Sequence, residues 1–163
     1  MPISYEVDLS GLEAVPVEAI RGALELGDAL PTQAQMYEIE AELAKLPQAD
    51  FSLINRFADG LYARQVTIKK GCLLTSKIHL KEHFAFILTG DISVWTDEDY
   101  QRVKAPQVLI TQPGTKRVLL AHEETVWITV HATKAKTVEE AEAELVSNDP
   151  ALINEARRVC RSG

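Results

Sequence analysis

The chain has 163 residues, of which 46% are hydrophobic and 25% charged, and a formal net charge of −7. These values are ordinary for one globular domain and give no surplus of lysine and arginine for neutralising nucleic-acid phosphates. No apolar run reaches the roughly 20 residues of a membrane span, and the first residues lack the pattern of a signal peptide. Cys72 and Cys160 lie far apart and suggest no disulfide framework. We therefore expect a cytoplasmic protein that binds neither nucleic acid nor membrane.

Residues 1–59 have the pattern of a helical segment. The stretch 15–26 predicts one helix, which Gly27 would end. A second helix is predicted to begin after the capping residue Thr32 and to end at Pro47. One face of this second helix is apolar, and it comprises Met36, Ile39, Leu43 and Leu46. We expect that face to pack over a sheet.

Between residues 61 and 133 the apolar positions repeat with a period of two. Turn signals recur at short intervals, so seven or eight short strands fit between them. No helical pattern interrupts the run, which favours antiparallel strands in a sandwich or barrel. Residues 84–88 and 126–130 are apolar on both faces. The flanking helices, a second subunit or both are expected to cover the outer face.

Two further helices are predicted in residues 134–163. Thr137 and Glu140 form the pattern of a capping box, and Asp149 followed by Pro150 is a typical helix start. The chain is thus expected to form a single globular domain, with a helical segment at 1–59, a β-barrel at 60–133 and a helical tail at 134–163.

The segment from Gly71 to Gly90 resembles the first signature of the cupin superfamily, G-x5-H-x-H-x3-E-x6-G. Both glycines stand at the spacing of that signature. His79 occupies the place of its second histidine, whereas Lys77 replaces the first histidine and His83 replaces the glutamate.

A second cupin signature, P-x-G-x2-H-x3-N, is matched more weakly. With Gly114 as the anchor, Arg117 stands in place of the histidine and Ala121 in place of the asparagine, while the proline is shifted by one residue to Pro113. In both signatures, then, the glycine framework is kept and the metal ligands are partly replaced.

This resemblance implies a mainly β fold, an antiparallel jelly-roll barrel that is frequently dimeric. Many cupins are metal-dependent dioxygenases, isomerases or decarboxylases, while others bind sugars or serve in storage and regulation. The stretch from Lys77 to His83, with Ala105-Pro106 and the segment from Pro113 to Glu123, is also similar to small cupin-like proteins of tailed bacteriophages. That second resemblance implies no activity, but it would place the protein in the host cytoplasm or the virion.

The candidate site lies within these two signatures. We expect His79 and His83 to converge across a pair of strands joined by a tight turn at residues 80–82. Two converging imidazoles are half of a site for a divalent transition metal such as iron, manganese, nickel or zinc. Lys77 and Arg117 oppose a metal, because neighbouring cations disfavour further positive charge. Lys77, His79, His83 and Arg117 together suit a small anionic ligand better.

Several residues in or near this site have other possible roles. Lys77 and Arg117 have a structural alternative, which is pairing with local acids such as Glu82 or Glu123. His122 lies too far along its strand to join the site, and His131 would need a shifted strand register. The tryptophans Trp95 and Trp127 either fill the core or a dimer contact, or form the wall of a pocket.

Three functions follow from these observations, and the sequence leaves open whether the protein is an enzyme. The first is binding of a small anionic metabolite or nucleotide-like ligand by a phage accessory protein. The second is metal-dependent dioxygenase or isomerase chemistry with His79 and His83 as ligands. The third is a structural role in which the barrel is a scaffold for assembly. No phosphate-binding loop, nucleophile elbow or H-E-x-x-H sequence is present to favour another class.

Overall fold

The computed structural model describes residues 6–8, 30–46 and 52–163 of the chain. The helix predicted at 15–26 lies outside these residues. The elements, in chain order, are β1 (Glu6–Asp8), α2 (Gln33–Leu43), β2 (Ser52–Ala58), β3 (Leu61–Ile68), β4 (Cys72–Thr75), β5 (His83–Thr89), β6 (Asp91–Trp95), β7 (Tyr100–Lys104), β8 (Gln107–Thr111), β9 (Val118–Ala121), β10 (Thr125–Ala132), α3 (Val138–Leu145) and α4 (Pro150–Ser162).

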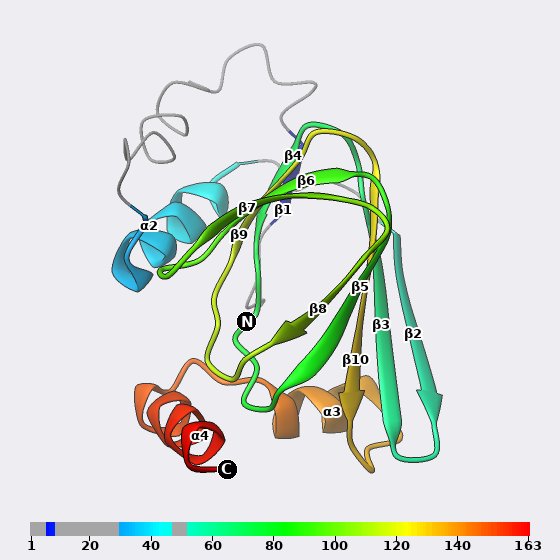
Figure 1. Ribbon diagram of the computed structural model, residues 1–163, viewed down its shortest axis with the longest axis vertical. Coiled ribbons are helices and arrows are strands. Elements are labelled where there is room, and N and C mark those ends of the chain that lie inside the picture. Colours follow the sequence, from blue (N-terminus) through cyan, green and yellow to red (C-terminus); the bar gives the residue numbers. More distant parts are fainter. Residues whose placement is uncertain (1–5, 9–29, 47–51) are drawn as a thin grey trace.

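The strands from β3 to β10 are wound as nested antiparallel pairs (Figure 1). β3 pairs with β10, β4 with β9, β5 with β8, and β6 with β7. Successive pairs alternate between sheet A, ordered β1-β4-β9-β6-β7, and sheet B, ordered β2-β3-β10-β5-β8. This winding defines a jelly roll. The predicted mainly β, antiparallel fold is confirmed, and the eight strands between residues 61 and 133 agree with the expected number.

Two details of the predicted barrel differ from the structure. Among the described strands no pairing joins sheet A to sheet B, so they form a two-sheet sandwich and no closed barrel. The prediction that two paired strands carry His79 and His83 is also wrong. β4 ends at Thr75 in sheet A, whereas β5 begins at His83 in sheet B. Residues 76–82 cross between the sheets, and their backbone groups bond to other elements, as Leu80 N does to Leu145 O.

The main core fills the space between the two sheets. Alternate residues of the facing strands are buried there, because side chains of a strand point to opposite faces in turn. This cluster includes Val66, Ile87, Ile92, Leu119 and Trp127. Trp127 is thus a core residue that also lines the cavity between the sheets, while Trp95 is partly buried in a second cluster beneath α2.

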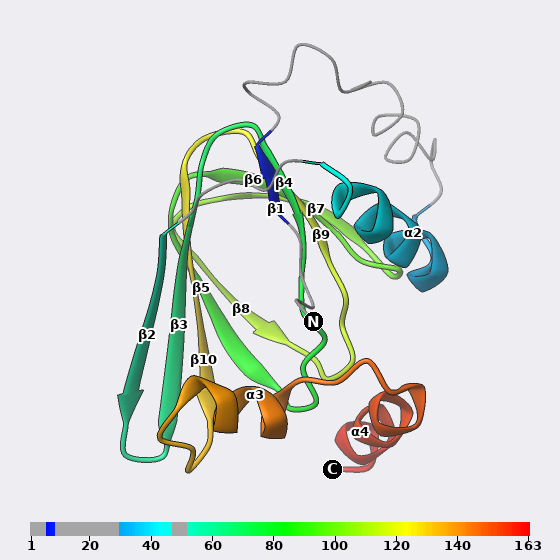
Figure 2. The same ribbon diagram turned by 180° about the vertical axis from the view of Figure 1, so that it is seen from behind.

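Helix α2 covers the outer face of sheet A, as predicted (Figure 2). Thr32 caps the helix as expected and forms a capping box with Gln35, while the helix ends at Leu43, before the predicted end at Pro47. The carboxylate of Glu40 is also buried beneath the helix, where it accepts hydrogen bonds from Nζ of Lys116 and from Oγ1 of Thr75. Lys116 is fully buried, so this ion pair joins α2 to sheet A away from water.

Helices α3 and α4 lie together at one end of the sandwich, the lower end in Figures 1 and 2. Thr137 and Asp149 cap them as predicted. Ala141 and Leu145 of α3 pack on Tyr62 of β3. Of the described residues of α4, only Ile153 is buried, while the apolar side chains of Leu152 and Val159 are exposed.

Sheet B begins before the predicted boundary at residue 60. β2 pairs with β3 along its full length, from Ser52 opposite Thr67 to Ala58 opposite Leu61. These residues, expected to belong to the helical segment, therefore belong to the sheet. None of the described helices is both long and apolar enough to cross a membrane.

Candidate functional site

Three histidines meet at the end of the sandwich that faces α3. His79 lies in the crossing segment, His83 begins β5, and His131 lies near the end of β10. The ring centroids are 4.6 Å apart for His79 and His83, 4.6 Å for His79 and His131, and 4.3 Å for His83 and His131. The structure thus brings His79 and His83 together, and it adds His131. We call these three residues the histidine cluster.

Strand pairing explains how His131 reaches the cluster. β10 pairs with β5 in a register that places Thr129 opposite Ala85 and Val130 opposite Phe84. One further step along both strands places His131 beside His83. The register shifts between Val126 and Trp127, at a β-bulge or similar irregularity of the ladder, and this shift precedes the alignment of His131 with His83. A bulge has no clear mark in the sequence, which is why His131 was expected to join the site only with a shifted register.

A cavity of about 60 Å³ lies beside the histidine cluster, between the sheets. Its polar lining consists of Arg64, Lys77, His79, His83 and Arg117, with Thr75, Ser76 and Thr129. None of the residues that line this cavity is acidic. All four residues predicted to bind a ligand, Lys77, His79, His83 and Arg117, therefore border one space, and Arg64 joins them.

Arg117 is the most constrained cation of this cavity. Its Nη2 donates a hydrogen bond to Oγ1 of Thr111 at 2.9 Å, and its guanidinium lies 5.9 Å from the centre of the Trp127 ring. Burial lowers the pKa of Arg117 to about 10. No salt bridge joins Arg117 to an acid within the described parts of the chain, so the predicted pairing with Glu123 is absent there.

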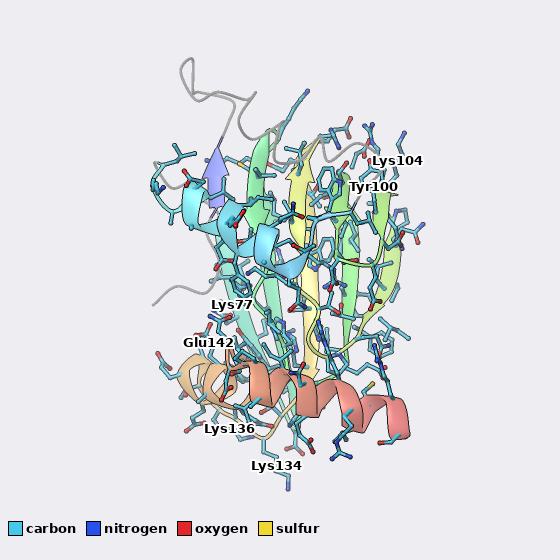
Figure 3. All side chains as sticks on the ribbon, turned by 90° about the vertical axis from the view of Figure 1, so that its left-hand side faces the viewer. Lys77, Tyr100, Lys104, Lys134, Lys136 and Glu142 are labelled. Carbon is cyan, nitrogen blue, oxygen red and sulfur yellow. The ribbon has the colours of Figure 1, made fainter. Side chains whose placement is uncertain are left out.

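Lys77, in contrast, is neutralised by a carboxylate of α3. Its Nζ forms an ion pair with Oε1 of Glu142, and Figure 3 shows the two side chains pointing toward one another. Lys77 thus pairs with an acid, as its structural alternative predicted, but that acid is Glu142 and not Glu82. That residue instead accepts a hydrogen bond from Gln112 at 2.9 Å. Sequence reasoning missed Glu142 because the contact depends on where α3 docks.

Arg64 also escaped the sequence analysis. It lies on β3 opposite Thr129 of β10, and its neighbours on the same face, Tyr62 and Val66, are buried. A cation between buried apolar positions of one strand face is the signal that would have identified it. No ion pair or hydrogen bond to the Arg64 side chain is found among the described residues, so the cavity contains two arginines without an acidic partner.

The histidines of the cluster are held neutral. Burial is the largest cause in each case: it lowers the pKa of His79 well below 6.5, that of His83 to about 4, and that of His131 to about 3. Neighbouring positive charge lowers these pKa values further, with Arg117 acting on His83 and Arg64 on His131. His79 and His83 therefore add polarity to the cavity wall at neutral pH without adding charge.

Hydrogen bonds orient two of the rings. Nδ1 of His83 lies 3.1 Å from the carbonyl oxygen of Lys81, which makes Nδ1 the donor and leaves Nε2 as an acceptor. Nε2 of His131 lies 2.9 Å from Oγ1 of Thr129. Nδ1 of His131 is the one buried side-chain nitrogen or oxygen without a partner among the described residues. An unpaired buried nitrogen is costly, and a buried water would satisfy it.

The same residues do not fit a metal ion. Within the described residues, no group of three or more His, Cys, Asp or Glu side chains is arranged to hold one. Arg64, Arg117 and Lys77 border the cavity, and a divalent cation would add to their charge. His79 and His83, predicted as ligands, therefore lie together without forming a metal centre. His122 is outside the cluster, as predicted, with its Nε2 bonded to Ser93 at 2.7 Å.

No family model and no curated protein matches the sequence. Among solved structures, the chain resembles a putative ethanolamine utilization protein Q from Salmonella typhimurium, with 11% identity, 53% of this chain and 72% of that chain covered, and a TM-score of 0.46. It also resembles a cupin superfamily protein from Desulfitobacterium hafniense, with 11% identity, 64% of this chain and 95% of that chain covered, and a TM-score of 0.45. A third structure, ectoine synthase from P. lautus, has 12% identity and a TM-score of 0.44, with 52% of this chain and 65% of that chain covered. Cupin proteins, the family that the segment Gly71–Gly90 resembles, are thus among its structural neighbours, and at these identities the likeness concerns the fold alone.

Proposed function

We propose that this protein binds a small anion in the cavity between its sheets, with Arg117 and Arg64 as the principal cations. The observation that supports this proposal best is the buried guanidinium of Arg117. Burial lowers its pKa to about 10, and it has no acidic partner among the described residues. A buried cation without a counter-charge is unfavourable, and an anion in the cavity would relieve that cost.

The size of the cavity limits the ligand. A water molecule requires roughly 10–15 Å³ of such volume, and sites for drug-sized molecules usually have about 300–1,000 Å³. A cavity of about 60 Å³ therefore suits a carboxylate or phosphate group and little more. Of the two predicted ligand classes, a small metabolite fits better than a nucleotide, whose base and ribose would have to lie outside.

The polar groups of the wall supply the remaining recognition. Arginine presents a planar fork of donors that matches carboxylate and phosphate oxygens. Nε2 of His83, left as an acceptor by the bond of Nδ1 to the carbonyl oxygen of Lys81, and the hydroxyl groups of Thr75, Ser76 and Thr129 add polar groups to the same wall. Lys77 is held by Glu142 and contributes less than the arginines. This role requires no chemical step and extends to a phage accessory protein that sequesters a metabolite.

Isothermal titration calorimetry of the full-length protein with inorganic phosphate, and separately with acetate, tests this proposal. We expect one site per chain and at least a tenfold loss of affinity in each of two variants, Arg117→Gln and Arg64→Gln. Arg161→Gln is the matched control, because this arginine is exposed on α4 and does not line the cavity. Equal binding in all four proteins, or none in the wild type, would overturn the proposal.

Native mass spectrometry of protein purified without chelator distinguishes anion binding from the metal-dependent alternative. An added mass that matches phosphate or a small organic acid supports the anion proposal. One transition-metal ion per chain, lost on His79→Ala substitution, would instead support the metal-dependent enzyme.

A further inference from the structure

Arg117 borders a second cavity besides the one of about 60 Å³ that lies between the sheets. We call the first the inner cavity and the second the side cavity. The side cavity has a volume of about 130 Å³. Within the described part of the chain, Arg117 is the one residue that lines both spaces. The other residues that line the side cavity are Val94, Thr96, Asp99, Gln101, Leu109 and Ile110.

The side cavity lies where the two sheets stay apart. β7 is the last strand of sheet A and β8 the last strand of sheet B, and no pairing joins these two among the described strands. They are connected by the short turn at residues 105–106, from which they lead into different sheets (Figure 1). Both strands contribute to the wall of the side cavity, as does the turn between β6 and β7. A ligand held at Arg117 can therefore extend between the edges of the two sheets.

The wall of the side cavity differs in charge from that of the inner cavity. Cations line the inner cavity without any acid, whereas the side cavity has one acid, Asp99, and one cation, Arg117. The remaining wall includes three apolar side chains, those of Val94, Leu109 and Ile110. One space is thus bordered by a positive charge, a negative charge and an apolar surface.

Both charges can bind further groups. Oδ1 of Asp99 accepts a hydrogen bond from the backbone nitrogen of Tyr100 at 2.8 Å, and Oδ2 accepts one from Nε2 of Gln101 at 2.7 Å. Asp99 forms no ion pair with the described residues, and each carboxylate oxygen has a second lone pair. Arg117 donates one side-chain hydrogen bond, to Thr111, out of five possible ones.

We infer that the ligand is a short zwitterion whose anionic group binds Arg117 and whose ammonium group binds Asp99. This inference rests on the proposed anion binding and defines the ligand class more closely. A site is complementary to a ligand that carries the opposite charge at each position, and a ligand with both groups satisfies both residues. The apolar wall suits a short hydrocarbon chain between them. An ω-amino acid has this arrangement, as does an aminoalkyl phosphate.

The volume of the side cavity limits the length of that chain. At roughly 10–15 Å³ for each water-sized volume, a space of about 130 Å³ holds on the order of ten such volumes. This is room for a few methylene groups and an ammonium group, while the anionic group occupies the inner cavity. A molecule that is too large for the inner cavity alone can therefore bind through both spaces.

Isothermal titration calorimetry of the full-length protein with three related carboxylates tests the inference. Acetate provides the anionic group alone, pentanoate adds the hydrocarbon chain, and 5-aminopentanoate adds the ammonium group. We expect the affinity to rise in this order, at least threefold at the last step, because a partly exposed ion pair contributes modestly. Pentylamine, which lacks the anionic group, should bind more weakly than 5-aminopentanoate.

The variant Asp99→Asn tests the residue that is assigned to the ammonium group. We expect it to bind pentanoate and 5-aminopentanoate with equal affinity. Asp97→Asn is the matched control, because Asp97 belongs to the same turn between β6 and β7 but does not line the side cavity. This control should keep the preference for 5-aminopentanoate.

Equal affinity of the wild type for pentanoate and 5-aminopentanoate would overturn the inference, and this comparison needs no variant to fold. A preference for 5-aminopentanoate that survives in Asp99→Asn would overturn it as well. In either case, binding of acetate that is lost in Arg117→Gln would leave the proposed anion binding intact. Absence of binding for acetate, inorganic phosphate and all three longer probes would overturn both proposals.

Discussion

His131 of β10 and His83 of β5 lie with their ring centroids 4.3 Å apart, and burial keeps both imidazoles neutral. Their pKa values of about 3 and about 4 are well below the ordinary 6.5, so the unfolded chain binds protons at pH values where the folded chain does not. The histidine cluster therefore makes folding stability depend on pH.

We predict that the free energy of unfolding falls as the pH is lowered below about 6.5. The full stability is present above that value, and it is lost as the pH falls toward 4 and 3, because protons then favour the unfolded state. The loss amounts to several kcal/mol, given about 1.4 kcal/mol for each unit of pKa shift. Urea unfolding at pH 7.5 and pH 5 measures it.

The variant His131→Phe removes one of these protonation sites and keeps a ring in contact with Tyr62. We expect its stability to fall less between pH 7.5 and pH 5 than that of the wild type. His122→Phe is the control, because His122 lies outside the cluster and bonds to Ser93. An equal pH dependence in wild type and His131→Phe would contradict the role given to the cluster.

The turn glycine Gly90 gives a second prediction. Its φ of +105° is unfavourable for other residues, and an added Cβ would lie 2.6 Å from the carbonyl oxygen of Glu124 and the Cα of Thr125. We expect Gly90→Ala to destabilise the protein by more than about 3 kcal/mol, since backbone strain alone costs about 1–3 kcal/mol. The thermal unfolding midpoint provides the measurement.

Gly60→Ala is the matched control for this substitution. Gly60 also has a positive φ, +75°, but an added Cβ there would meet no atom within 4 Å. Its cost should be on the order of 1 kcal/mol, from backbone strain alone. Similar effects of both substitutions would show that the close approach of Thr125 to Gly90 is unimportant.

The buried pair of Glu40 and Lys116 gives a third prediction. Lys116→Met leaves the carboxylate of Glu40 buried with only the hydroxyl of Thr75 as a donor. Removing one partner of a buried ion pair costs about 3–5 kcal/mol. The double variant Glu40→Gln/Lys116→Met should be more stable than Lys116→Met alone, and urea unfolding of the three proteins checks this order. If the double variant is the least stable, Glu40 does not depend on Lys116 as its counter-charge.

The fold was predictable from the sequence because it rests on local patterns. The period-two run predicted antiparallel strands, and Gly71 and Gly90, both of positive φ, mark the turns that the cupin signature places. The capping residues Thr32, Thr137 and Asp149 fixed three helix starts. These features depend on neighbouring residues and are readable without tertiary information.

The candidate site was only partly predictable, because its remaining members depend on long-range docking. His79 and His83 were expected to meet through a hairpin, and they meet instead across the crossing from sheet A to sheet B. His131 joins them through a bulge, and Glu142 reaches Lys77 through the position of α3. No local pattern encodes such contacts between distant segments.

The ion pair between Lys77 and Glu142 provides the last prediction. Glu142 neutralises a lysine that borders the cavity, so the variant Glu142→Gln should free that charge for the ligand. We expect the affinity for inorganic phosphate to rise a few-fold, since a partly exposed ion pair is worth about 1 kcal/mol or less. The gain should disappear in Lys77→Gln/Glu142→Gln. Glu139→Gln, at an exposed position of the same helix, controls for the loss of one negative charge. If Glu139→Gln raises the affinity equally, the effect is a general one of net charge, and Lys77 takes no part in binding.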